Sequence, residues 1–333
     1  MFAHFSARID GCPTSPMTAA SQQDLAREPE PKSAIRARVI ANYGADVELL
    51  TDSGERLIAA PLKRIGLLVS GDRVTAEVSS HGGSFSARVC ELENRNTTLS
   101  RTDRSGKIKA VAANLTQLVV VTAPAPPFDT LLLDRYTVAA RHIGVDVTIL
   151  INKTDLLDEK TAIQADAIEA LYTSIGYPVL RCCLTSGEGV ESLASRLHDH
   201  VSILVGQSGV GKSSLLNRLL PDLDVRTGEL SRQSGLGKHT TSVTTWFSLP
   251  QGGAIIDSAG VRQFSLDHIP SADIQFGFTE ISDAAQYCKF TNCTHAHEPD
   301  CAVKEALAEN RISRQRFENF TLLHESSTEA RQY

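Results

Sequence analysis

The chain has 333 residues and a formal net charge of −6; 41% of its residues are hydrophobic and 22% are charged. This length and balance are typical of a globular protein with two or three domains, large enough to build its cores without disulfide bonds. The longest apolar runs fall far short of the roughly 20 residues of a membrane-spanning helix, and the acidic net charge argues against broad electrostatic attraction to nucleic acid.

The first 33 residues mix proline, serine, alanine and charges without periodicity. They lack the apolar stretch of a secretory signal, so we expect residues 1–33 to form a disordered tail on a cytoplasmic protein, with Met17 as an alternative start. The seven cysteines are expected to be reduced thiols, because the cytosol does not favour disulfides.

Short runs of alternating polar and apolar residues follow from Ala34 to about Leu99. They lie at 35–40, 46–50, 73–78 and 86–89, with the turn-forming stretches 52–54 and 82–83 between them. Strand-length runs at this spacing predict a small antiparallel β-barrel. Four basic residues come next and predict a loop-like, solvated connection: Arg101, Arg104, Lys107 and Lys109.

The pattern then changes to strands separated by stretches of helical length. We expect strands at 117–122, 147–151 and 201–205, and helices at 131–143 and 161–175. Strands that alternate with helices predict a parallel sheet flanked by helices, so the centre of the chain is predicted to be an α/β domain.

A phosphate-binding loop is predicted where the strand at 201–205 ends. The segment reads Gly206-Gln207-Ser208-Gly209-Val210-Gly211-Lys212-Ser213, and a helical pattern continues from Ser214. Glycines at this spacing let backbone N–H groups and the helix N-terminus point at phosphates. From their positions we expect Lys212 to lie between the β- and γ-phosphates and the Ser213 hydroxyl to bind Mg²⁺.

A strand predicted over 253–257 ends in an aspartate. Asp257 is followed by Ser258-Ala259-Gly260, and an acid at such a strand end can hold Mg²⁺ through water. The Gly260 amide is expected to approach the γ-phosphate. Since Asp-x-x-Gly is also a common turn, this prediction depends on the phosphate loop upstream.

The choice of base is predicted from the segment Asn152-Lys153-Thr154-Asp155, which follows the strand at 147–151. A carboxylate accepts hydrogen bonds from N1–H and the 2-amino group of guanine, whereas adenine offers no such pair of donors. Asp155 is therefore expected to select GTP. Lys153 is expected to lie along the base and ribose, and Asn152 to brace the loops.

Conventional GTPases place the phosphate loop first and the Asn-Lys-x-Asp segment last, and here the order is reversed. With a β-domain before and a Cys/His cluster after, the layout resembles the circularly permuted ribosome-biogenesis GTPases of the RsgA (YjeQ) family. The resemblance also rests on Asp134-Arg135-Tyr136, on the stretch 235–241 (Gly-Leu-Gly-Lys-His-Thr-Thr) and on 257–264. It covers nearly the whole chain beyond the tail.

The resemblance implies an OB-fold at 34–100, a permuted GTPase domain at 101–268 and a zinc-binding domain at 269–333. It also implies an enzyme that hydrolyses GTP to GDP and phosphate and assists late maturation of the small (30S) ribosomal subunit. The subunit is expected to stimulate hydrolysis, its 16S rRNA to be bound, and the protein to be a monomer.

The family's switch I region corresponds to Thr240 and Thr241, and we prefer Thr241 as the residue that closes over Mg²⁺ and the γ-phosphate. Val261 stands where many GTPases orient the attacking water with glutamine. His239 is the nearest polar candidate for that role, with a surface loop histidine as the alternative.

Two positions depart from the family pattern. Ala259 replaces the usual proline, and the segment expected to back the guanine has Cys182 and Cys183 where a serine is usual. The contact at these cysteines is therefore left open.

Near the C-terminus, Cys288, Cys293, His295 and Cys301 offer three thiolates and an imidazole within 14 residues. Four such ligands close a tetrahedral Zn²⁺ site and leave no open position for catalysis, so structural zinc is predicted. His297 competes with His295 as the nitrogen ligand, but the spacing matches the family at His295. The alternative is a set of buried cysteines without metal.

Apolar periodicity at 302–307 and 317–323 predicts helices that pack around the metal site. Basic residues here, Arg311, Arg314 and Arg316, predict either an RNA-facing patch with Arg262 nearby or a solvated helix face. The OB-fold offers a second RNA-binding surface.

Two other classes of function stay open. A P-loop kinase or ATPase would phosphorylate a small substrate, and it predicts that changing Asp155 leaves nucleotide preference unaltered. A zinc-containing RNA-binding module with a structural nucleotide site predicts ribosome binding that ignores the nucleotide.

Overall fold

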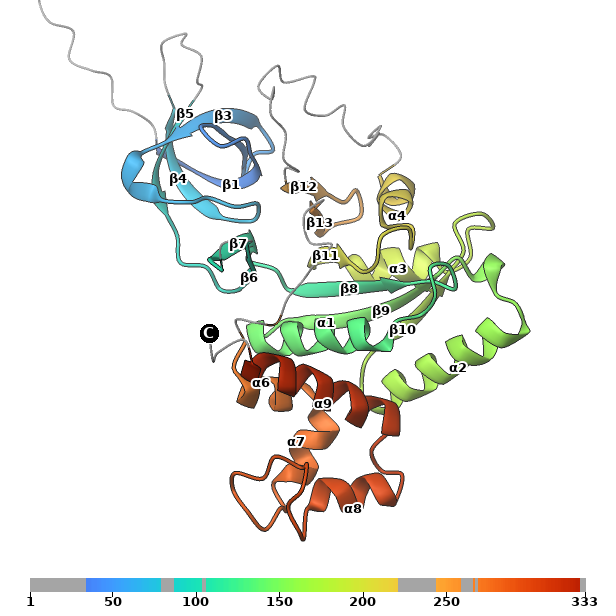
Figure 1. Ribbon diagram of the computed structural model, residues 1–333. Helices are drawn as coiled ribbons and strands as arrows, with labels where there is room; N and C mark the ends of the chain where they lie inside the picture. The colour runs from blue at the N-terminus through green and yellow to red at the C-terminus, as the bar shows by residue number, and fades with distance from the viewer. Residues whose placement is uncertain are drawn as a thin grey trace, which may run out of the picture. The chain divides into compact units, whose positions relative to one another are not determined.

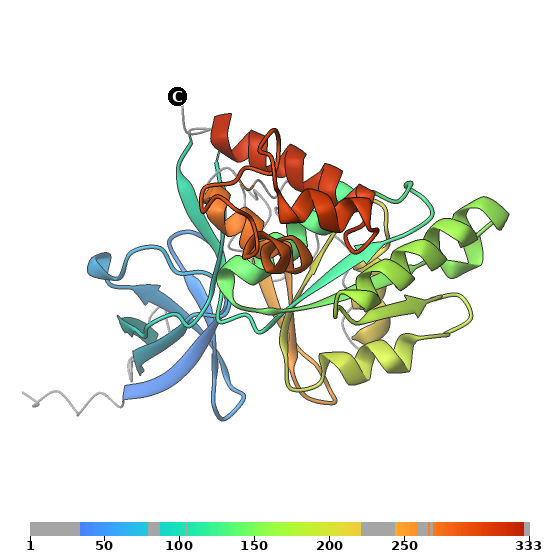
Figure 2. The same ribbon diagram turned by 90° about the horizontal axis from the view of Figure 1, so that it is seen from below.

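The computed structural model describes residues 34–78, 87–103, 106–220, 244–258, 266 and 269–329. These residues belong to one compact unit, Ser33–Tyr333. The tail predicted at 1–33 lies outside the described residues. Within the described ranges the strands form an eleven-stranded sheet and a separate two-stranded sheet. Helices cover both faces of the parallel part of the eleven-stranded sheet (Figures 1 and 2).

The N-terminal strands close into a small barrel. They are β1 (Ala34–Asn42), β2 (Val47–Thr51), β3 (Arg56–Pro61), β4 (Arg73–Val78) and β5 (Ala87–Leu92), with a 3-10 turn at Lys63–Ile65. The pairing runs β1-β2-β3-β5-β4, and β4 pairs back to β1, which closes the ring. The inward residues of each strand are apolar and form a core of their own, including Val39, Leu49 and Val74. The all-β prediction is confirmed. The barrel is not wholly antiparallel as predicted, because β3, which the sequence pattern missed, pairs parallel with β5.

The basic connection after the barrel was predicted to be a loop, but the structure shows a hairpin there. It consists of β6 (Thr98–Thr102) and β7 (Ile108–Ala113), paired antiparallel. Lys109 forms an ion pair with Asp103 at 2.7 Å across this hairpin. The loop prediction was wrong because the basic residues suggested a solvated segment, whereas Leu99, Ala112 and Ala113 of the hairpin are buried. Arg104 lies outside the described residues.

The central sheet is parallel, in the order β10-β9-β8-β11-β13, and β12 adds an antiparallel strand beside β13. The strands are β8 (Gln117–Thr122), β9 (Asp146–Asn152), β10 (Val179–Cys182), β11 (Val201–Val205), β12 (Thr244–Ser248) and β13 (Ala254–Ser258). A single register pair, Ala41 opposite Thr245, joins β1 to β12. The predicted parallel sheet is confirmed.

Alternate residues of the parallel strands point to opposite faces of the sheet, and each face has its own core. Leu118 and Val120 pack with α1 (Thr130–Ile143) and α2 (Glu159–Ser174), whereas Val119 and Val121 pack with α3 (Val190–Leu197) and α4 (Lys212–Leu219). A 3-10 turn, Thr154–Leu156, follows β9. Because the strands are buried on both faces, their sequences read as continuous apolar runs.

Four C-terminal helices pack on the α1 face: α6 (Ser271–Gly277), α7 (Thr279–Ala285), α8 (Ala302–Ala308) and α9 (Arg314–Glu329). Phe278 and Phe320 meet edge to face at 5.5 Å within this core. The helices predicted at 302–307 and 317–323 are confirmed. None of the described helices is long and apolar enough to cross a membrane. The domain boundaries at 100 and 268 stay predictions.

Candidate functional site

The predicted phosphate loop connects β11 to α4, and two of its glycines are required by close contacts. Gly206 has φ +135°, and a Cβ there would lie 2.1 Å from the carbonyl oxygen of Val121. Gly211 has φ +101°, and a Cβ there would lie 2.4 Å from Nδ2 of Asn152. Side chains are therefore excluded where the loop leaves the strand and enters the helix.

Lys212 is the first residue of α4, and its side chain turns back over the loop. Its Nζ donates to the carbonyl oxygens of Gly206 at 2.8 Å and Gln207 at 2.6 Å. The first N–H groups of α4 receive no side-chain cap from Gly211. A cation and the N-terminal end of a helix thus lie together, which is the arrangement that favours an anion.

The predicted base-reading segment lies against this loop, although 58 residues separate Asn152 from Val210. Asn152 Nδ2 donates to the Val210 carbonyl oxygen at 2.8 Å. Lys153, which has φ +59°, donates from Nζ to the carbonyl oxygens of Gly209 at 2.5 Å and Ala125 at 3.1 Å. Asn152 Oδ1 is buried and has no hydrogen-bond partner among the described residues.

Asp155 lies beside the two cysteines whose role the sequence left open. The Cys183 thiol donates to Asp155 Oδ1 at 3.3 Å and accepts from the Ser186 N–H at 3.5 Å. Thr154 Oγ1 donates to the Cys182 carbonyl oxygen at 3.4 Å. Burial, with a smaller contribution from Cys183, raises the pKa of Cys182 to about 11, so this thiol is neutral at pH 7. Cys183 is the residue in contact with the acid.

The strand-end acid Asp257 lies on β13, which runs parallel to β11. Ile256 is paired with Ile203, so Asp257 lies at the edge of the sheet where β11 continues into the phosphate loop. Ser208, Ser213 and Ser214 are exposed around the loop and the first turn of α4. His239, Thr240, Thr241, Gly260 and Arg262 lie outside the described residues, as does Ala259.

Cys288, Cys293, His295 and Cys301 converge on one point, with their ligand atoms within 4.8 Å of one another. His295 Nδ1 lies 3.7 Å from the Cys288 sulfur and 3.4 Å from the Cys301 sulfur. This group can hold a metal ion. His295 is buried, whereas His297 is exposed and is not part of the cluster.

Gln275 on α6 is a neighbour of the cluster that the sequence pattern did not reveal. Its Oε1 lies 3.2 Å from His295 Nε2. A proton on Nε2 completes that hydrogen bond and leaves the Nδ1 lone pair facing the sulfurs, so the ring presents its ligand nitrogen to the metal position. Nothing in the spacing of the cysteines points to Gln275.

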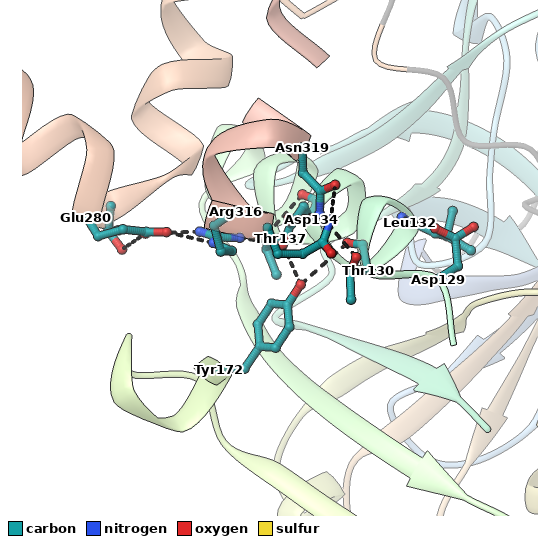
Figure 3. Close-up of polar contacts among 11 residues, drawn as sticks. Asp129, Thr130, Leu132, Asp134, Thr137, Tyr172, Glu280, Arg316 and Asn319 are labelled. Carbon is teal, nitrogen blue, oxygen red and sulfur yellow. Dashed lines mark hydrogen bonds and ion pairs between the residues drawn. The ribbon is translucent and has the colours of Figure 1, made fainter. Parts of the chain in front are cut away.

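Arg316 is fully buried and does not belong to the predicted RNA-facing patch. Its guanidinium contacts Asp134 on α1 and Glu280 on α7 (Figure 3). Arg311 and Arg314 are exposed, so of the three arginines at 311–316 these two lie on the surface. The prediction for Arg316 was wrong because an arginine in an amphipathic helix normally faces water, and its two carboxylate partners come from distant segments.

Comparisons with known proteins agree on one family. A model for the RsgA GTPase family matches residues 92–267. The small ribosomal subunit biogenesis GTPase RsgA of Pseudomonas syringae pv. tomato is 43% identical over 286 residues, which are 85% of this chain and 82% of that protein. The protein of the same name from Azotobacter vinelandii is 44% identical over 288 residues, with the same shares of both chains.

Two solved structures share the fold. YjeQ from Thermotoga maritima superposes with a TM-score of 0.73 at 26% identity, covering 89% of this chain and 99% of that one. YloQ, a circularly permuted GTPase, superposes with a TM-score of 0.69 at 23% identity, covering 91% of this chain and 98% of that one. The likeness therefore spans the barrel, the central sheet and the C-terminal helices.

Proposed function

The chain belongs to the RsgA GTPase family and is a small ribosomal subunit biogenesis GTPase, and we propose that it binds and hydrolyses GTP between segment 152–155 and the phosphate loop 206–214. The observation that carries this proposal is the pair of hydrogen bonds from Asn152 and Lys153 to the loop carbonyls of Val210 and Gly209. They hold the base-reading and phosphate-binding segments at a common edge of the sheet, despite the permuted order.

In the proposed complex Asp155 accepts hydrogen bonds from the guanine edge, and Cys183 keeps its carboxylate in place. Lys212 moves its ammonium from the loop carbonyls to the phosphate oxygens, and loop amides stabilise the charge that develops in the transition state. The buried acceptor Asn152 Oδ1 supports a site completed by a bound molecule, because buried polar atoms are ordinarily paired.

We assign Ser213 and Thr241 as ligands of Mg²⁺, with Asp257 binding the ion through water. The Gly260 amide is assigned to the γ-phosphate. Mg²⁺ neutralises phosphate charge when bound there. His239 is our candidate for orienting the attacking water. Thr241, Gly260 and His239 are assigned from the family motif alone.

For the C-terminal cluster we propose one structural Zn²⁺. Three thiolates and an imidazole are the donor set that zinc prefers in closed sites, and the Gln275 contact supports a ring that donates through Nδ1. In that role the metal stabilises the loop between α7 and α8 rather than taking part in hydrolysis.

A role in small ribosomal subunit biogenesis implies association with the 30S subunit. We propose that the cytoplasmic protein acts there as a monomer, that it contacts 16S rRNA, and that the subunit stimulates hydrolysis. The two flanking modules support this proposal, since OB-folds bind RNA. The nucleotide state would then change the affinity for the subunit.

The proposal is tested by measuring nucleotide binding and phosphate release with GTP and ATP on the purified protein. We expect GTP to bind, to be hydrolysed slowly, and to be displaced by GDP and not by ATP. Tighter binding of ATP, or transfer of phosphate to a small substrate, would remove the assignment of this pocket to guanine.

A further inference from the structure

A buried polar cluster joins the C-terminal helices to α1 (Figure 3). Arg316 donates to Asp134 Oδ1 at 2.5 Å through Nη1, and to both oxygens of Glu280 at 2.6 and 3.0 Å through Nε and Nη2. Asn319, one turn later on α9, donates to Asp134 Oδ2 at 2.7 Å. Tyr172 from α2 donates to Asp134 Oδ1 at 2.5 Å.

Both carboxylate oxygens of Asp134 accept hydrogen bonds in this cluster. Its oxygens face Arg316, Asn319 and Tyr172, and each of these partners donates a hydrogen bond to it. Burial raises the pKa of Asp134, and the three partners oppose that shift. Burial alone would lower the pKa of Arg316, but its carboxylate partners raise it above the ordinary arginine value. The contact is thus a fully paired buried salt bridge, which holds its elements in one arrangement.

The first turn of α1 is also contacted by residues of α9 and α2. Asn319 Nδ2 donates to Thr130 Oγ1 at 3.3 Å. The Tyr172 hydroxyl, whose one proton goes to Asp134, lies 3.4 Å from the Thr130 carbonyl oxygen. Thr130 and Asp134 lie four residues apart, on one face of the helix. Hydrogen bonds therefore join the N-terminal half of α1 to α9 at two successive turns, at Thr130 and at Asp134.

The same half of α1 holds the phosphate loop. Asp129, the N-cap, accepts from the Leu132 N–H at 2.9 Å with Oδ1 and from Gln207 Nε2 at 3.3 Å with Oδ2. The buried hydroxyl of Tyr136 hydrogen-bonds with the backbone of Gly206. Both contacts reach residues at the start of the loop. Neither depends on the bonds from the base-reading segment, which reach Gly209 and Val210.

We propose that Arg316 is a positioning residue for the phosphate loop. It acts through Asp134, which fixes the first turns of α1 and with them the side chains that hold Gln207 and Gly206. The C-terminal helices are therefore a supporting part of the nucleotide site, and a partner that moves α9 changes nucleotide affinity. This inference rests on the proposed function of the loop.

The test compares Arg316→Met with Arg314→Met. Both remove an arginine from the first turn of α9, but Arg314 is exposed, and no hydrogen bond or ion pair joins it to α1 among the described residues. We expect the Kd for fluorescent GDP to rise about tenfold in Arg316→Met and to stay at the parent value in Arg314→Met. Hydrogen exchange of the amides at 206–212 should also quicken in Arg316→Met alone. Arg316→Lys should recover part of the affinity.

An Arg316→Met protein that folds, keeps its metal and binds GDP as tightly as the parent would overturn the proposal. If that variant does not fold, Asn319→Ala replaces it. This change keeps both ion pairs and removes the donations to Asp134 and Thr130, together with the bond that Asn319 Oδ1 accepts from Gln315 on the same helix at 3.2 Å. Its expected effect is about threefold on Kd, with faster exchange at 206–212. Parent-like affinity and exchange in Asn319→Ala would likewise overturn the proposal. Failure of the parent to bind GDP would instead contradict the proposed function.

Discussion

The side-chain amide of Asn152 donates to the carbonyl oxygen of Val210 at 2.8 Å, and this bond joins the base-reading segment to the phosphate loop. Asn152 is the last residue of β9 and Val210 follows β11, and these two strands flank β8 in one sheet. A parallel sheet brings its carboxyl ends to one edge whatever the order of the strands in the chain. The permuted order therefore still brings both segments to one edge of the sheet.

Changing Asp155 to Asn should alter the choice of base. The amide presents a donor to N1–H of guanine, so GTP affinity should fall by about 10- to 100-fold while xanthosine triphosphate binds better than in the parent. Competition between the two nucleotides in a binding assay measures the change. An unaltered preference for GTP would show that another group reads the base.

Alanine at Gly211 should weaken nucleotide binding more than alanine at Gly209. Both glycines have positive φ, but only at Gly211 would the new Cβ meet a neighbour closer than 3 Å, namely Asn152 Nδ2 at 2.4 Å. At Gly209 the nearest atom is Pro126 Cδ at 3.7 Å. Both variants carry a backbone strain of about 1 kcal/mol, because both positions have positive φ. The difference in Kd between Gly211→Ala and Gly209→Ala therefore measures the effect of the clash.

Adding Asn152→Ala to Gly211→Ala gives the matching control. The smaller side chain removes the clash, and the double variant should bind GDP better than the sum of the two single effects predicts. Strictly additive effects would place the cause elsewhere in the loop.

His295→Ala and His297→Ala form a matched pair for the metal cluster. We expect His295→Ala to lose most of its bound zinc and to melt at a lower temperature, because a structural site contributes directly to folding. His297→Ala should keep one zinc per chain, since that side chain is exposed. Elemental analysis and thermal melting measure both, and zinc loss in the His297 variant alone would reverse the ligand assignment.

The alkaline stability of the protein should depend on Tyr136. Burial raises the pKa of this hydroxyl from 10.0 to about 12. The unfolded chain gives up this proton from about pH 10 and the folded chain holds it to about pH 12, so stability is full below pH 10 and falls between those values. Tyr136 contributes at most about 2–3 kcal/mol to that fall.

Tyr136→Phe should flatten the decline of unfolding free energy between pH 10 and pH 12, measured by denaturant titration at each pH. Tyr287→Phe serves as the control, because Tyr287 is 81% exposed and its change leaves the buried hydroxyls in place. Equal slopes for the parent and Tyr136→Phe would contradict the assignment.

Contiguous patterns predicted most of the fold and the segments of the candidate site. The runs at 117–122 and 201–205 coincide with β8 and β11, because strands buried on both faces are uniformly apolar. β3 was missed since its apolar run is short and ends in Pro61. The loop and the segment at 152–155 were identifiable because each is defined by neighbours in sequence.

Contacts between distant segments could not be predicted from these patterns. Asp134 and Arg316 are 182 residues apart. The helical spacing from Phe320 and Leu323 puts Arg316, and not the exposed Arg314, on the buried face of α9, but it does not identify the carboxylate partners. The Cys183 thiol beside Asp155 is a similar case, since only the packing of β10 against β9 brings the two together. A buried polar partner is specified by tertiary packing and leaves no trace in spacing.

The most direct test of the account is GTP turnover measured with and without purified small ribosomal subunits. We predict a low rate for the protein alone and a rate at least about tenfold higher with the subunits, as a partner-assisted GTPase site requires. GTP binding without any stimulation by the subunits would contradict the account of a ribosome-dependent GTPase.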